Sequence, residues 1–254
     1  MATGVYPARR ICVVATIIMY LCACKFAALH ELVLPLAACA VMVWFLIMRR
    51  QPASISEVSS SFMGIFYVGY MPSFWVRLRS LSNLPIRTIG VPAFLSALPA
   101  DIWTQGAVIK WWVCFSIVCS DVAAYFAGKK FGMHHLSSLG RGAAGKTSPN
   151  KTIEGASAGI LASTALSLLG AKAMQWPLWA ITGPAFGVLL GLTAVVGDLT
   201  ASMFKRDAGL KDYGDLLPGH GGVLDRFDSY ILTGPLVYFF MSYILPLVAK
   251  AATG

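Results

Sequence analysis

The stretch WWVCFSIVCSDVAAYFAG, Trp111 to Gly128, decides the fold class of this chain. Asp121 is its single charged residue. An apolar run of this length can cross a hydrocarbon core about 30 Å thick as an α-helix, because the helix rises about 1.5 Å per residue. Similar apolar runs recur at about 11–29, 32–48, 60–76, 88–100, 109–127, 156–171, 177–197 and 230–249. The pattern predicts an all-α polytopic integral membrane protein with about 7–9 transmembrane helices.

The composition supports the same class. Hydrophobic residues make up 57% of the 254 residues and the mean hydropathy is +0.70, more apolar surface than a soluble fold of this size can bury. The formal net charge is +9, from 20 Lys and Arg against 11 Asp and Glu. These bases lie in short segments between apolar runs, where they would face the headgroups of a lipid bilayer and phosphorylated substrates. This distribution argues against nucleic acid as a partner.

The cysteines and the N-terminus point to a single membrane domain. All six cysteines lie in apolar stretches without a C-x-x-C pair, so we interpret them as small buried hydrophobes. No small-residue cleavage site precedes the second apolar run, so the first run is interpreted as a span and not as a cleaved signal peptide. We expect N-terminal transmembrane helices over 1–104 and a catalytic transmembrane region over 105–254, as one continuous membrane domain.

The basic loops make the topology ambiguous. Bases at 9–10 and 49–50 mark one membrane face, yet strict alternation would place the basic loops 77–87 and 128–155 on the other. Prolines interrupt two weaker runs, which could be kinked, re-entrant or interfacial: Pro72, Pro92 and Pro99. We therefore expect run 60–76 not to cross fully, and a tight hairpin at His30–Glu31. Two crossings separate the long polar segments 128–155 and 198–229, so both should share a face.

The segment KRDAGLKDYGDLLPGHGGVLDRFDS, Lys205 to Ser229, concentrates acids in an otherwise apolar chain. Asp225 and Asp228 are three residues apart, so on a helix they lie on one face. With a third carboxylate they could form an oxygen site for magnesium, or they could be an N-terminal pair stabilised by the helix dipole. Asp198 ends one apolar run and Asp121 interrupts another. Acids at such depth serve a function, cap a helix or pair with a cation.

Bases and glycines accompany these acids. Four side chains offer donors to phosphate oxygens: Lys205, Arg206, Lys211 and Arg226. The turn PGHGG at 218–222 allows close backbone approach to a ligand, and it is not a Walker P-loop. His220 could donate to a phosphate, although a lone loop histidine is more often structural. Together these residues indicate metal-assisted phosphoryl or nucleotidyl transfer on a lipid.

The second polar segment contains SPNKTIEG, 148–155. Lys151 and Thr152 are donors of the kind that bind phosphate. The alternative is a basic loop ending at a helix N-terminus, with Ser148 or Thr152 as the cap and Glu154 in the first turn. The two adjacent histidines at 134–135 lack partners at metal-ligand spacing, so we expect no zinc there.

The stretch SMFKRDAGLKDYGDLLPGHGGVLDRFD, Ser202 to Asp228, resembles the signature of the phosphatidate cytidylyltransferases, the CDP-diacylglycerol synthases. The fixed positions of that signature are all met, namely Ser202, Lys205, Arg206, Lys211, Asp212, Pro218, His220, Gly221, Gly222, Asp225, Arg226 and Asp228. Upstream, SDVAAYFAGKKFG and SPNKTIEG resemble two further segments of the family, and Gly197–Asp198 supplies the Gly-Asp expected before the signature. The resemblance covers about residues 120–229.

The resemblance implies the reaction of CTP with phosphatidate to give CDP-diacylglycerol and pyrophosphate, with Mg²⁺ and a second cation such as K⁺. It implies that Asp198 and Asp225 hold the metals, assisted by Asp228 and Ser202. The acids would act with Lys205, Arg206 and Lys211 as the catalytic set. The substrate-binding set would be Ser148, Lys151, Thr152, Glu154, His220, Gly221, Gly222 and Arg226.

Two positions depart from the family pattern. Ala201 stands where members often have Glu, which leaves the ligands of a second cation open, and Ile153 stands where Trp is common. The chain is also short at its N-terminus for this family, so we expect an early span to be absent.

Three rival functions stay open at this point. They are a CTP-dependent polyprenol or phytol kinase, a membrane transporter and an inactive relative. A bacterial inner membrane, the endoplasmic reticulum or a plastid membrane would each suit the spans, and a homodimer is open.

Overall fold

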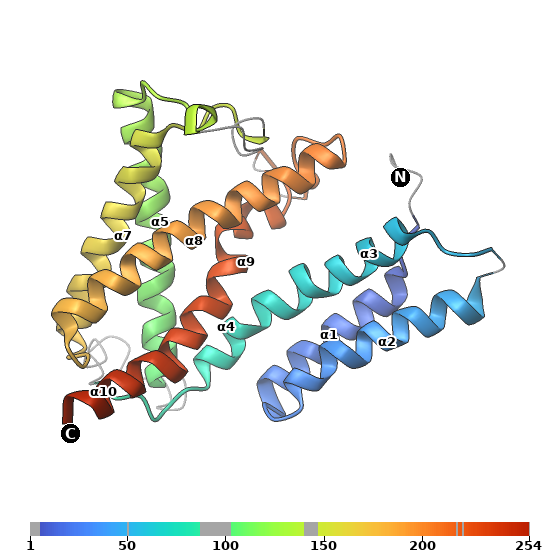
Figure 1. Ribbon diagram of the computed structural model, residues 1–254, viewed down its shortest axis with the longest axis horizontal. Coiled ribbons are helices and arrows are strands. Elements are labelled where there is room, and N and C mark those ends of the chain that lie inside the picture. Colours follow the sequence, from blue (N-terminus) through green and yellow to red (C-terminus); the bar gives the residue numbers. More distant parts are fainter. Residues whose placement is uncertain are drawn as a thin grey trace. The chain divides into compact units, whose positions relative to one another are not determined.

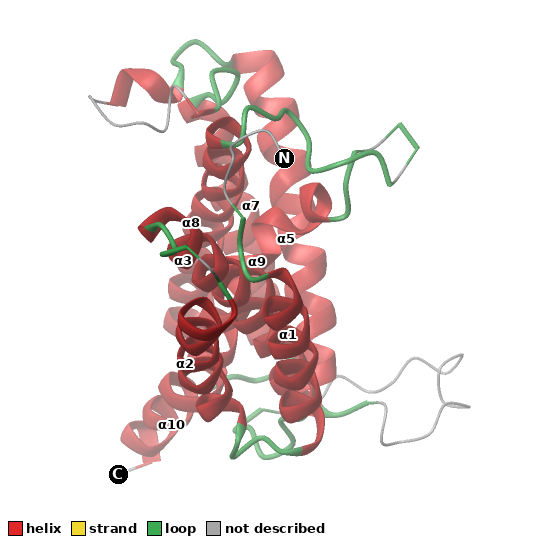
Figure 2. Cartoon of the chain, turned by 90° about the vertical axis from the view of Figure 1, so that its right-hand side faces the viewer, coloured by secondary structure: helices red, strands yellow, loops and turns green. Residues whose placement is uncertain are grey.

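The computed structural model describes residues 6–49, 51–86, 103–139, 147–216, 218–219 and 221–253. These residues form helices and loops, with one isolated β-bridge between His135 and Thr152 (Figure 2). The chain divides into two compact units, residues 1–80 and 81–254. The division expected at residue 104 stays a prediction. The predicted run 88–100 lies outside the described residues.

The described residues of unit 1 form four α-helices and one π-helix. Their bounds are α1 Arg9–Lys25, α2 His30–Met48, α3 Ile55–Gly64, the π-helix η1 Ile65–Tyr70, and α4 Met71–Arg79. Helices α1 and α2 pack through buried side chains such as Met19 and Val41. His30 is already the first residue of α2, and the chain reverses over 26–29. The hairpin was predicted at His30–Glu31, but the turn lies just before these residues in the sequence.

Segments α3, η1 and α4 follow one another without a break from Ile55 to Arg79 (Figure 1). Proline inside an α-helix removes one backbone hydrogen bond and clashes with the preceding turn. Pro72 is accommodated because a π-turn precedes it, in which the N–H of Met71 bonds to the oxygen of Phe66. A second π-helix, η5 Phe240–Ile244, precedes Pro246 in the same way. We call the continuous segment 55–79 the α3–α4 rod.

The α3–α4 rod runs the full length of the α1–α2 hairpin. At one end the N–H of Ala8 donates to Ser61 Oγ at 2.9 Å. At the other end His30 Nε2 and Ser73 Oγ lie 2.7 Å apart. The expectation that run 60–76 does not cross fully stays a prediction: the helix is continuous through Pro72, but this segment is not among the described helices that are long and apolar enough to cross a membrane.

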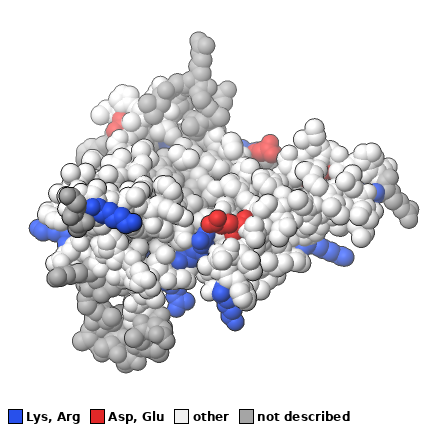
Figure 3. All heavy atoms as spheres, turned by 60° about the horizontal axis from the view of Figure 1, so that its bottom comes forward, with Lys and Arg blue, Asp and Glu red and all other residues white. Residues whose placement is uncertain are grey.

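Unit 2 contains the longest helices. They are α5 Gln105–Phe131, the 3-10 helix η4 Leu136–Leu139, α7 Ile153–Ala173, α8 Trp179–Asp207, α9 Leu224–Phe239, and, after η5, α10 Leu245–Thr253. Over the described residues of both units, five helical segments are long and apolar enough to cross a membrane: His30–Met48, Gln105–Phe131, Ile153–Ala173, Trp179–Asp207 and Leu224–Ala252. Uncharged atoms dominate the face drawn in Figure 3. The predicted all-α membrane class is confirmed.

Small residues let α5, α7, α8 and α9 approach closely, as is common between membrane helices. A Cβ on Gly155 of α7 would lie 2.8 Å from the carbonyl oxygen of Ala124 in α5. A Cβ on Gly197 of α8 would lie 2.8 Å from the carbonyl oxygen of Asp228 in α9. These two contacts join the polar ends of α5 and α7, and those of α8 and α9.

Candidate functional site

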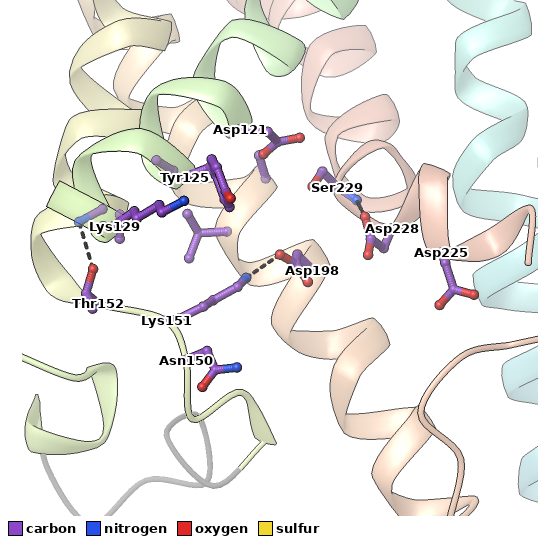
Figure 4. A pocket seen from close by; sticks show the side chains of 16 residues that line it. Asp121, Tyr125, Lys129, Asn150, Lys151, Thr152, Asp198, Asp225, Asp228 and Ser229 are labelled. Carbon is purple, nitrogen blue, oxygen red and sulfur yellow. Dashed lines mark hydrogen bonds and ion pairs between the residues drawn. The ribbon is translucent and has the colours of Figure 1, made fainter. Parts of the chain in front are cut away.

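A cavity of about 530 Å³ lies at the end of unit 2 where α5 and α8 end and α7 and α9 begin (Figure 4). Its volume falls in the range of small-molecule sites, roughly 300–1,000 Å³. The polar side chains that line it come from four parts of the chain: Asp121, Tyr125, Lys129, Asn150, Lys151, Thr152, Asp198, Asp225, Asp228 and Ser229.

The two long polar segments meet at this cavity. Lys151, which precedes α7, forms an ion pair with Asp198 of α8 (Figure 4). Nearby, Arg206 Nε donates to the carbonyl oxygen of Thr147 at 3.4 Å. The prediction that segments 128–155 and 198–229 share a face is confirmed.

The N-terminus of α7 is built as the capping alternative predicted. Thr152 Oγ1 accepts the N–H of Gly155 at 3.2 Å, and Thr152 also lines the cavity. Glu154 lies in the first turn but binds His134, whose Nδ1 is 2.7 Å from Glu154 Oε1. Neither Glu154 nor Ser148 lines the cavity, so the structure places only part of the predicted substrate-binding set there.

Three carboxylates reach the cavity from three different helices, Asp121 from α5, Asp198 from α8 and Asp228 from α9. The side chain of Asp198 is 32% exposed, and Ser202, one turn further on, lies with Oγ 3.5 Å from Asp198 Oδ1. Asp228 Oδ1 accepts the N–H of Ser229 at 2.7 Å. Oxygen donors that open on one cavity beside the ammonium groups of Lys129 and Lys151 suit the handling of phosphates and hard cations.

Asp225 differs from these three acids, although it also lines the cavity. Its carboxylate accepts from Lys205 Nζ at 3.0 Å, from the N–H of Tyr213 at 2.8 Å and from the N–H of Gly222 at 2.9 Å. Its side chain is only 6% exposed. Asp225 therefore ties the loop between α8 and α9 to both helices, and its metal-binding role stays a prediction.

The glycines of the PGHGG turn have a local explanation. Gly221 has φ +74°, in the left-handed region that favours glycine. A Cβ on Gly221 or Gly222 would lie 3.1 or 3.2 Å from Asp225 Oδ2. His220, the remaining member of the predicted set in this turn, lies outside the described residues.

The four predicted bases lie near the cavity without lining it. Lys205 is held by Asp225 and Arg206 by the carbonyl of Thr147. Lys211 and Arg226 are exposed. The structure thus separates the bases from the inner cavity, where Lys151 and Lys129 are the lining cations.

Several lining residues were not among the predicted site residues, although Asp121 had been singled out as an acid inside an apolar run. Asp121, Tyr125 and Lys129 follow one another at intervals of four, the spacing that aligns side chains on one helix face. That spacing within a known family segment could have identified them. Nothing in the sequence pointed to Asn150 and Ser229 except their position beside the predicted residues Lys151 and Asp228.

No three His, Cys, Asp or Glu side chains of the described residues converge as a ready-made metal group. A cation at the cavity would thus need oxygens from a substrate as well as from the protein. Mg²⁺ commonly binds in this way, through one or two carboxylates, waters and substrate phosphates.

The fold and cavity define an all-helical membrane protein with a site suited to phosphate transfer chemistry. Residues 2–244 match the profile of the cytidylyltransferase family, and the chain belongs to this family. It is therefore an enzyme of the nucleotidyltransferase class. The resemblance drawn from the signature is confirmed.

Named relatives are found in a cyanobacterium and a plant. A Synechocystis protein named phosphatidate cytidylyltransferase is 38% identical over 253 residues, covering 97% of this chain and 83% of the relative. Phosphatidate cytidylyltransferase 5, chloroplastic, of Arabidopsis thaliana is 42% identical over 81% of this chain and 50% of the relative. Phosphatidate cytidylyltransferase 4, chloroplastic, of the same plant is 39% identical over 94% and 59%.

Proposed function

We propose that this enzyme transfers the cytidylyl group of CTP to phosphatidate, giving CDP-diacylglycerol and pyrophosphate. The observation that carries the proposal is the cavity at the helix ends, where Asp121, Asp198 and Asp228 meet Lys151. The names of the relatives support CTP and phosphatidate as the substrates.

In the proposed reaction a phosphate oxygen of phosphatidate attacks the α-phosphorus of CTP. A new P–O bond forms while the bond between the α-phosphorus and its bridging oxygen breaks, and pyrophosphate leaves with the electron pair. The attacking phosphate monoester is already anionic at neutral pH, so no general base is required. Positioning and charge compensation then supply most of the rate enhancement.

Lys151 is the cation best placed to act on the reacting phosphates. It lines the cavity, its side chain is 27% exposed, and the end of its flexible stem can move from Asp198 to a phosphate oxygen. Thr152 lies beside it on the cavity wall. Outside the cavity lining, four bases would attract and orient the two anionic substrates: Lys205, Arg206, Lys211 and Arg226.

The residues present fit a magnesium ion. The carboxylates of Asp198 and Asp228 would hold it, with the hydroxyl of Ser202 beside Asp198. When bound, Mg²⁺ would supply neutralisation of the phosphate oxygens. Ala201, where members of the family often have Glu, is fully buried and presents no carboxylate, so a second cation such as K⁺ would need other ligands.

The site would work at a membrane face, where phosphatidate resides. Relatives from a cyanobacterium and from chloroplasts support a bacterial inner membrane or a plastid membrane as the host.

Product analysis tests the proposal. Purified protein in mixed micelles would receive phosphatidate, Mg²⁺ and CTP labelled in the cytosine ring, followed by lipid extraction. We expect label in the lipid phase and an equal amount of pyrophosphate in water. Label released as CDP would indicate a lipid kinase, and label left in CTP would contradict both enzymes.

A further inference from the structure

The loop between α8 and α9 contains one aromatic residue, Tyr213, that the sequence analysis did not assign. Three of its groups make contacts with residues around it. The hydroxyl donates to the carbonyl oxygen of Ala201 at 2.9 Å, and the N–H donates to Asp225 Oδ2 at 2.8 Å. Lys205 Nζ lies 5.5 Å from the centroid of the ring. Tyr213 therefore contacts two positions of α8 and the first turn of α9.

The glycine turn packs against the same residue. A Cβ on Gly222 would lie 3.1 Å from the carbonyl carbon of Tyr213, and the N–H of Gly222 shares Asp225 Oδ2 with the N–H of Tyr213. Two parts of the loop that are well separated in sequence are thus joined at one carboxylate oxygen. The main chain of Tyr213 binds that oxygen, while its side chain anchors the residue to Ala201 and Lys205 of α8.

Two groups attract the ammonium of Lys205, the carboxylate of Asp225 and the ring of Tyr213. Asp225 Oδ1 is 3.0 Å away, and the face of the Tyr213 ring attracts a cation through its quadrupole. The side chain of Lys205 is 13% exposed, whereas Lys211, six residues further on, is exposed. Two lysines of one short segment therefore differ sharply in how freely they can move.

We propose that Tyr213 is a positioning residue, which holds Lys205 on Asp225 of the cavity lining and so orients the phosphates of CTP. This role rests on the proposed cytidylyl transfer, because it supposes that the Lys205 charge acts on that substrate. Tyr213 itself does not line the cavity, so it acts through Lys205 and Asp225.

The hydroxyl of Tyr213 is a donor at every pH useful for an assay. Burial, together with the negative charges of Asp225 and Asp228, raises its pKa to about 12. A tyrosine whose pKa is raised stays protonated below that value. The hydrogen bond from the hydroxyl to Ala201 should therefore be unaffected by pH between about pH 6 and pH 10.

Two substitutions separate the contacts. Tyr213→Phe removes only the hydroxyl bond to Ala201, and Tyr213→Leu removes the ring above Lys205 as well. Both keep the main-chain N–H that binds Asp225. Tyr20→Phe is the matched control, since the hydroxyl of Tyr20 also faces a carbonyl oxygen, that of Val68 in unit 1 at 3.5 Å.

The first experiment does not depend on activity. Lysine acylation by a water-soluble ester, quantified by mass spectrometry of the peptides, compares Lys205 with Lys211 in one sample. We expect Lys205 to react about tenfold more slowly than Lys211 in the unsubstituted protein. Tyr213→Leu should raise the Lys205 rate severalfold, with a smaller rise in Tyr213→Phe and none in Tyr20→Phe. An unchanged Lys205 rate in Tyr213→Leu would overturn the proposal.

The second experiment measures kinetic constants on folded protein selected by size-exclusion chromatography. The KM for CTP should rise about threefold in Tyr213→Phe and about tenfold in Tyr213→Leu, while kcat stays within about twofold. A fall in kcat with KM unchanged would contradict a positioning role. If the unsubstituted protein performs no cytidylyl transfer while the lysine rates behave as expected, the proposed function fails and the contacts of Tyr213 stand.

Discussion

Each unit has a hollow of similar volume, but their walls differ in chemistry. The hollow of unit 1, about 540 Å³, lies along α1 and α2, and Arg10 is the single charged residue that lines it. The cavity of unit 2, about 530 Å³, is lined by four carboxylates and two lysines. Volume alone therefore does not identify the functional site. The convergence of ionisable groups does, because burying them is costly unless they are paired or used.

Two buried polar side chains of unit 1, Glu57 and His30, have partners within the unit. Glu57 bonds to Arg49 Nη1 at 2.5 Å and forms a capping box with Ser54 at the start of α3. His30 lies beside Ser73. In unit 2, by contrast, Asp121, Asp198 and Asp228 face a common space. The comparison suggests that the polar groups of unit 1 maintain structure and those of unit 2 perform chemistry.

The largest effect is expected from a substitution among the acids of the unit 2 cavity. Asp198→Asn should lower cytidylyl transfer at least about 100-fold, because it removes a charge at the reacting phosphates while keeping the shape of the side chain. Circular dichroism should show a folded protein. Asp207→Asn, an exposed acid at the end of the same helix, should leave the rate within about twofold. Equal losses in both variants would contradict a specific role for Asp198.

A smaller loss is expected at the cation of the cavity. Lys151→Gln should lower kcat/KM by roughly 10- to 100-fold, since it removes a charge that would bind phosphate. The exposed Lys130, whose Nζ lies 5.3 Å from the ring centroid of Phe131, supplies the control Lys130→Gln. Initial rates over a range of CTP concentrations measure both. A normal kcat/KM in Lys151→Gln would remove Lys151 from the proposed mechanism.

Substituting one glycine in each unit by alanine compares how tightly the helices of the two units are packed. Gly155→Ala should destabilise the protein by about 1–3 kcal/mol, because the added Cβ would lie 2.8 Å from the carbonyl oxygen of Ala124. Gly64→Ala should be neutral or stabilising by up to about 1 kcal/mol, since no atom lies within 4 Å of its added Cβ and the backbone is helical. Thermal unfolding in detergent measures both. A lower melting temperature for Gly64→Ala than for Gly155→Ala would be the contrary result.

The smallest effect is expected in unit 1. Glu57→Gln weakens the bond to Arg49 and half of the capping box, so the melting temperature should fall slightly. The KM for CTP should not change, because the described residues that line the cavity all belong to unit 2. A changed KM would mean that the polar groups of unit 1 also serve the reaction.

Much of the fold could be predicted from apolar run length. The runs at 109–127, 156–171 and 177–197 correspond to α5, α7 and α8. Helices α5 and α7 extend a few residues further at each end, whereas α8 begins two residues later than its run and continues ten residues beyond it. Run length says less about 60–76, because a proline signals a break and the sequence does not show that a π-turn will precede it and keep the helix continuous. The hairpin at residue 30 was misplaced because a polar residue suggests a loop. His30 is instead the buried first residue of α2.

The site was predictable in part. Asp198, Asp228, Lys151 and Thr152 line the cavity as expected from their residue types and the resemblance. The partners of Asp225 could not be predicted, because two of its three donors are main-chain N–H groups positioned by the loop. A sequence pattern identifies side chains, whereas the backbone conformation decides which of them stay available to a ligand.

Photocrosslinking tests the central claim, that the nucleotide binds in the cavity of unit 2, most directly. The probe is 5-azido-CTP, irradiated with the protein in lipid micelles, and the labelled peptides are mapped by mass spectrometry. We predict label in the segments 121–129 and 150–156, lost when unmodified CTP is present in excess. Label in unit 1, or label in unit 2 that excess CTP does not remove, would contradict the account.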